Sequence, residues 1–112
     1  MESKKVLDKV IEILEGKKAK DISIINIEGI SILTDYFVIC SGTSSTHIKS
    51  LADELEEKME EKGFKIFHKE GYDTARWILM DFGEVIVHVF HEEERSFYKL
   101  ERLWSDGLIT YR

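Results

Sequence analysis

Cys40 and His47 are seven residues apart and are the first pair in the sequence that could do chemistry. A thiol beside an imidazole can act as a nucleophile with its own base. Cys40, however, ends a run of apolar residues, and a cysteine in that setting usually packs as a small hydrophobic side chain. We therefore predict no catalytic residue here.

The remaining histidines do not form a metal-binding pattern. His88 and His91 are three residues apart, and on a strand that spacing points two side chains to opposite faces. His68 lies in another segment, and a single cysteine leaves no zinc signature. We predict neither a metal nor a cofactor, and we interpret His88 as a hydrogen-bonded sheet residue.

The segment 41–45, Ser-Gly-Thr-Ser-Ser, lies between a predicted strand and a predicted helix, where phosphates often bind. It is similar to the Gly-Ser turn of nucleotidyltransferases, which also need paired carboxylates on a nearby strand to hold Mg²⁺. The next predicted strand, 64–69, has no carboxylate. Hydroxyl capping of the helix is the favoured interpretation. A nucleotidyltransferase-like enzyme that uses Ser41, Gly42 and Ser44 is the alternative.

Composition and charge narrow the class of protein. The 112 residues, 43% of them hydrophobic, predict one domain over 1–112 that folds without disulfides. One cysteine suits a reducing compartment, and no apolar run resembles a signal peptide or a membrane span. We expect a cytoplasmic protein without membrane contact. The net charge of −6 predicts little direct nucleic-acid contact and favours a basic protein as partner.

Apolar periodicity predicts the elements that position these residues. The predicted order is helix, strand, strand, helix, three strands and a last helix. This is an α/β (α+β) fold with a five-stranded mixed sheet and flanking helices. The first helix covers 4–15, the second ends at Gly63, and the last covers 92–104. The predicted strands are 21–27, 35–40, 64–69, 76–81 and 84–90.

The last two strands predict a hairpin with two unlike faces. A turn centred on Phe82-Gly83 would place Trp77 opposite His88, Leu79 opposite Ile86 and Ala75 opposite Phe90. One face is then aliphatic and belongs against the helices: Ile78, Met80, Val85, Val87 and Val89. The other face mixes rings with aliphatic residues: Trp77, Leu79, Ile86, His88 and Phe90. This mixed face either is a second core beneath the last helix, which sequence alone favours, or binds a partner.

Three segments together resemble a known family. They are 35–45, 75–90 and 93–104, and their order and spacing resemble the ribosomal silencing factor (Iojap-like) family over about residues 4–105. Glu84 stands where that family more often has aspartate, and the tail 108–112 lies outside the pattern.

The resemblance implies a fold akin to nucleotidyltransferases but without their catalytic carboxylates, and so a protein that is not an enzyme. It implies binding to ribosomal protein fourteen of the large ribosomal subunit, on the face where the small subunit joins. A factor bound there blocks subunit joining and represses translation. The resemblance also implies a link to large-subunit maturation and a homodimer in the free protein. A dimeric assembly scaffold is therefore a further alternative.

The expected partner-binding residues combine the mixed hairpin face with nearby charges. The apolar centre is expected at Trp77, His88, Phe90 and Tyr98, because large rings are enriched at contact sites. Acidic partners for basic side chains are expected at Asp73, Glu93, Glu94 and Glu101, and Arg76 is a further expected contact residue.

Overall fold

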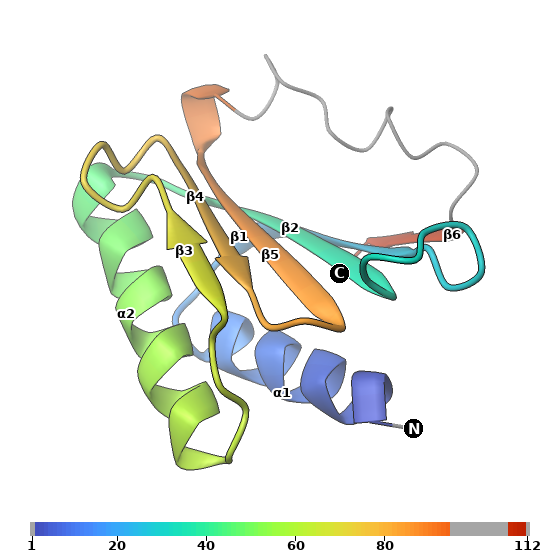
Figure 1. Ribbon diagram of the computed structural model, residues 1–112. Helices are drawn as coiled ribbons and strands as arrows, with labels where there is room; N and C mark the ends of the chain where they lie inside the picture. The colour runs from blue at the N-terminus through green and yellow to red at the C-terminus, as the bar shows by residue number, and fades with distance from the viewer. Residues whose placement is uncertain (1, 95–107, 112) are drawn as a thin grey trace.

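A computed structural model of the chain describes residues 2–94 and 108–111. The helices α1 (Glu2–Gly16) and α2 (Ser45–Glu61) lie on the same face of one sheet (Figure 1). The described strands are β1 (Lys20–Asn26), β2 (Tyr36–Gly42), β3 (His68–Glu70), β4 (Trp77–Asp81), β5 (Val85–His91) and β6 (Leu108–Tyr111).

The sheet is mixed, as the sequence predicts. Its described strands follow the order β3-β4-β5-β2-β1-β6. Strands β2 and β5 pair in parallel, and the other neighbours are antiparallel. The predicted fold class and its flanking helices are confirmed. Strand β6, which pairs with β1 at the sheet edge, is an addition to the five predicted strands.

Both helices turn a predicted apolar stripe towards the sheet. Val10 and Leu14 of α1 and Leu51 and Leu55 of α2 have no exposed surface. Fully burying a side chain of this size contributes about 1.5–3 kcal/mol. The helix α2 ends where predicted, since Gly63 adopts a φ of +86° that glycine tolerates.

Two predicted elements differ from the structure or lie outside it. The strand predicted at 64–69 is wrong in its bounds, because β3 covers only His68–Glu70, an exposed edge strand. Phe64 and Ile66 instead pack against the core beneath the helices. Residues 92–94 are helical, and the rest of the helix predicted over 92–104 lies outside the described residues.

The register of the hairpin differs from the predicted one. Trp77 pairs with Phe90, Leu79 with His88, and Asp81 with Ile86, so the three predicted pairs are wrong. The turn is centred one residue later, on Gly83-Glu84, because the N–H of Gly83 donates to Oδ1 of Asp81 at 2.7 Å and Gly83 takes a φ of +88°. The pairing shifts by two residues, which leaves every side chain on its predicted face.

Candidate docking surface

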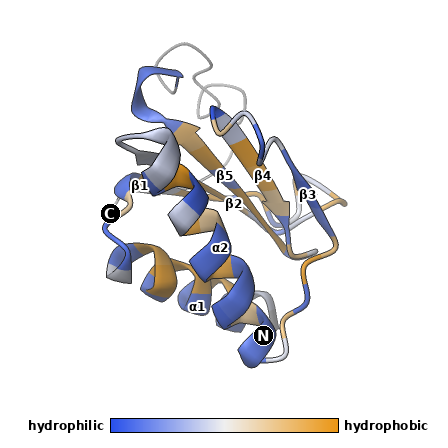
Figure 2. Ribbon diagram, turned by 90° about the vertical axis from the view of Figure 1, so that its left-hand side faces the viewer, coloured by the Kyte–Doolittle hydropathy of each residue, from blue (hydrophilic) through white to orange (hydrophobic). Residues whose placement is uncertain are grey.

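The hairpin presents its two faces to different surroundings. The aliphatic face, for example Ile78 and Val87, packs in the core cluster that contains α1 and α2. The hydrophobic strands β4 and β5 stand beside these helices, which are hydrophilic on their outer side (Figure 2). The mixed face belongs to a second, smaller cluster in which Phe90 packs with Ile39 and Trp77. This second cluster lies on the sheet face turned away from the two helices.

An aromatic cluster is built on this second face. The Trp77 ring stacks on Phe90, with centroids 4.9 Å apart and planes inclined by 26°. Phe37 meets His88 edge to face, with centroids 5.2 Å apart. His88 is 6% exposed and Phe90 only 1%, whereas Trp77 is half-buried. His88 and Phe90 were expected to contact a partner, and in this structure both rings are packed into the cluster with Trp77 and have almost no exposed surface.

His88 is hydrogen-bonded, as predicted. The indole Nε1–H of Trp77 donates to Nδ1 of His88 at 3.0 Å. Burial lowers the pKa of His88 to about 4, because the charged imidazolium loses its hydration inside the cluster. The imidazole is therefore neutral at physiological pH.

Charged side chains gather at the end of the hairpin where β4 begins with Trp77 and β5 ends at His91. The guanidinium of Arg76 lies 3.7 Å from a carboxylate oxygen of Glu93 and 3.7 Å from one of Glu94. Asp73 is exposed in the turn before β4. We call Asp73, Arg76, Glu93 and Glu94 the charged rim. It holds three carboxylates and one guanidinium, so its net charge is negative.

Backbone contacts hold the charged rim in place. The N–H of His91 donates to the carbonyl of Arg76 at 2.8 Å, and Nδ1 of His91 accepts the N–H of Glu93 at 3.2 Å. His91 thus ties both sides of the rim together, a role that the sequence did not indicate. The other two expected contact residues, Tyr98 and Glu101, lie outside the described residues.

Gly71 shapes the turn that carries Asp73. It has a φ of +81°, and a Cβ placed on it would lie 2.1 Å from the carbonyl oxygen of Trp77. Only glycine allows so close an approach of the turn to β4. The N–H of Ala75 closes the turn by donating to the carbonyl of Gly71 at 3.1 Å.

The segment 41–45 serves the helix, as the favoured interpretation predicts. Oγ of Ser44 accepts the N–H of His47 and caps α2. A Cβ on Gly42 would lie 2.8 Å from Cγ1 of Ile48, so this glycine allows strand and helix to pack closely. Cys40 is fully buried. Within residues 2–94 and 108–111, no three potential metal ligands gather in one place.

Comparisons with known proteins identify the family. The model of a family described as "Ribosomal silencing factor during starvation" matches residues 1–110. The ribosomal silencing factor of Bacillus subtilis is 43% identical over 110 residues, which are 98% of this chain and 93% of that protein. The chain belongs to the ribosomal silencing factor family.

A solved structure and a more distant relative agree with this family. A crystal structure of a Chromobacterium violaceum protein matches with a TM-score of 0.90 and 33% identity, covering 94% of this chain and 88% of that one. A mouse protein named "Mitochondrial assembly of ribosomal large subunit protein 1" is 32% identical over 102 residues, which are 88% of this chain but 45% of that protein.

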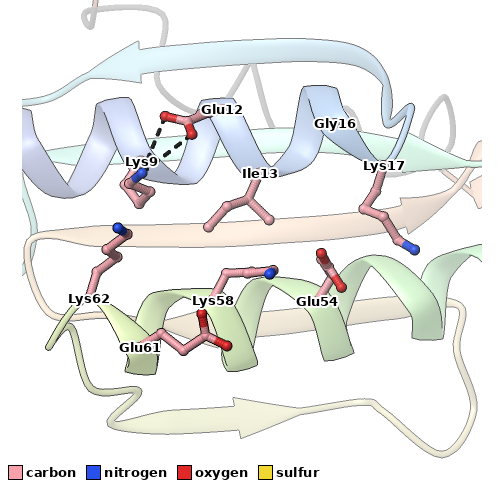
Figure 3. Close-up of a pocket in the computed structure, with 9 residues that line it drawn as sticks. All are labelled: Lys9, Glu12, Ile13, Gly16, Lys17, Glu54, Lys58, Glu61 and Lys62. Carbon is pink, nitrogen blue, oxygen red and sulfur yellow. Dashed lines mark hydrogen bonds and ion pairs between the residues drawn. The ribbon is translucent and has the colours of Figure 1, made fainter.

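The chain also has a groove on its helical side. The groove between α1 and α2 has a volume of about 400 Å³ and is lined by four lysines and three glutamates, with Ile13 and Gly16 between them (Figure 3). Lys9 pairs with Glu12 at 3.3 Å. These charges largely cancel, so the groove has no clear net charge, whereas the charged rim is negative overall. In the described part of the chain, no helix is long and apolar enough to cross a membrane.

The loop between β1 and β2 exposes aliphatic side chains that sequence reasoning missed. Ile32 is fully exposed and Leu33 is 82% exposed. Local hydrogen bonds hold the loop, including one from the N–H of Ser31 to the carbonyl of Ile27 at 3.0 Å. The sequence does carry a signal for this loop, because the polar residues Ser31 and Thr34 interrupt the apolar residues around them.

Proposed function

We propose that this protein docks on the large ribosomal subunit through ribosomal protein fourteen and blocks joining with the small subunit, which represses translation. One observation carries the proposed docking site: a half-buried tryptophan at the end of the hairpin that also carries the carboxylates of the charged rim. Family membership supports the ribosomal context, and the resemblance seen in the sequence supports the choice of partner.

The geometry around Trp77 suits a protein contact. Tryptophan in a central, partly desolvated position is enriched among the residues that dominate binding energy. The ring is held in advance by Phe90 and His88, so docking loses little side-chain entropy. The carboxylates of Glu93 and Glu94 add a negative potential that favours a basic surface.

The proposed contact therefore differs in part from the one expected from sequence. Trp77 stays at the centre, and the charged rim stays around it. His88 and Phe90 become its support, while Tyr98 and Glu101 remain proposed contact residues. The action is steric: the protein occupies part of the surface where the small subunit would bind. In this proposal no bond is made or broken, and no cofactor is needed. The protein would act in the cytoplasm as a regulator with a single domain.

A binding experiment tests the proposed partner. Purified large subunits are sedimented with the protein in the presence of increasing amounts of isolated ribosomal protein fourteen. We expect the protein to pellet with the subunits, and the free ribosomal protein to compete it away. Pelleting that is unaffected by a saturating amount of competitor would show that another component of the subunit is bound.

A second candidate is a dimeric scaffold in large-subunit assembly. The name of the mouse relative, which refers to assembly of the large subunit, favours it. Light scattering of the protein alone and of its complex with large subunits separates the candidates. The scaffold requires two copies per subunit, whereas steric blocking requires one. A single bound copy would exclude the dimeric scaffold.

A further inference from the structure

The hydrogen bond between Trp77 and His88 fixes which imidazole nitrogen carries the proton. An indole N–H can only donate, so Nδ1 of His88 must be the unprotonated acceptor. The neutral ring then carries its proton on Nε2. Among the described residues, this Nε2 has no hydrogen-bond partner. A buried donor without an acceptor is unfavourable, so the Nε2 side of His88 does not stabilise the fold. The role of His88 is therefore sought in the bond that its Nδ1 makes to Trp77.

The same bond fixes the orientation of the Trp77 ring. The indole is held at its nitrogen by His88 and across its face by Phe90, 4.9 Å away. His88 itself stays in place through its edge-to-face contact with Phe37. With the N–H turned inward, the ring has only carbon atoms to offer on its exposed side.

We propose that His88 is a positioning residue that holds the Trp77 ring in its docking orientation and turns the indole N–H away from the partner. This inference rests on the proposed function, because it assigns a role within the same surface. Trp77 then receives the aliphatic stem or the cation of a basic side chain rather than a hydrogen-bond acceptor. The neighbouring carboxylates of Glu93 and Glu94 suit such a side chain.

A purely structural His88 makes a different prediction. If the imidazole served only to fill the core, a residue of similar size without nitrogen would leave docking unchanged. If it positions Trp77, docking must depend on an acceptor at the site of Nδ1. His88→Leu removes the acceptor and also the unpartnered Nε2, so we expect its stability at neutral pH to stay close to wild type. His88→Asn keeps an acceptor, Oδ1, at about the position of Nδ1.

The experiment combines these two variants with nuclear magnetic resonance. The chain has two tryptophans, Trp77 and Trp104, so Trp77→Phe assigns the two indole N–H signals of the ¹⁵N-labelled protein. We expect the Trp77 indole proton to exchange slowly with water in wild type and in His88→Asn, and rapidly in His88→Leu. We expect His88→Leu to bind large subunits about fivefold to tenfold more weakly, as the loss of one neutral hydrogen bond predicts. His88→Asn should restore most of that binding.

The outcomes decide between the roles. Slow indole exchange in His88→Leu would show that Nδ1 is not the acceptor and overturn the inference. Folded His88→Leu that docks as tightly as wild type would also overturn it, as would His88→Asn that docks as weakly as His88→Leu. If wild type itself fails to bind large subunits, the proposed function fails, and indole exchange still decides whether His88 holds the ring.

Discussion

Acid should destabilise this protein through the buried side chain of His88. Burial lowers the pKa of His88 from 6.5 to about 4, so the unfolded state takes up a proton that the native state refuses. The contribution to stability is complete above pH 6.5 and is lost as the pH falls towards about 4. The full shift of about 2.5 pKa units corresponds to about 3 kcal/mol, and about 2 kcal/mol of it is lost by about pH 5.

The assay is urea unfolding at a series of pH values between about 5 and 8, followed by tryptophan fluorescence and compared with His88→Leu. Other titrating groups are the same in both proteins, so the difference between the two curves isolates His88. We expect the free energy of unfolding of wild type to fall relative to the variant by about 2 kcal/mol at the acidic end. Parallel curves would refute the reasoning, because they would mean that His88 is hydrated in the native state.

Three further predictions concern the docking surface and the turn that carries Asp73. Trp77→Ala should weaken binding to large subunits about thirtyfold in a sedimentation assay. Phe67→Ala, which removes an exposed ring near Gly83 at the other end of the hairpin, should change binding little, and equal losses would contradict a central role of the indole. Glu93→Gln should weaken the same binding a few-fold at low salt and hardly at all at high salt, and a loss independent of salt would contradict a role in the charged rim. Gly71→Ala should destabilise the fold by about 2–4 kcal/mol in a denaturant melt, because its Cβ would lie 2.1 Å from a carbonyl oxygen. Gly16→Ala, with open space around it, should be neutral or stabilising, and equal effects of the two substitutions would exclude the clash.

The helices and the central strand were predictable because their pattern is dense and regular. Leu51 and Leu55 repeat at helical spacing, and both are fully buried. Val38 to Cys40 form an unbroken apolar run, and all of them are covered on both faces of the sheet. The helical spacing indicates a helix directly, and the short apolar run indicates a strand because it is rich in β-branched and aromatic residues and ends at a turn.

The hairpin shows where sequence reasoning stops. Its faces were correct because alternation in a strand survives a shift of two residues. Its register was wrong because the side chain of Asp81 captures the N–H of Gly83 and moves the turn by one residue. Local turn chemistry of this kind is not visible in the apolar pattern.

The sequence indicated which residues form the candidate site but not how deeply each side chain is buried. Sequence placed Trp77, His88 and Phe90 on one face, and the structure confirms that they form one cluster. It did not reveal that only Trp77 is partly exposed, because the exposure of a ring depends on what packs over it. Ile32, for which the sequence analysis made no prediction, is fully exposed, although aliphatic residues are more often buried.

Subunit joining is the most direct measure of the central claim. Purified large subunits are saturated with the protein, small subunits are added, and the particles are separated on a density gradient. We predict that the joined particle disappears in proportion to the protein bound, and that the Trp77→Ala protein at the same concentration leaves most of it intact. Joined particles that persist, and carry the bound protein, would contradict steric blocking.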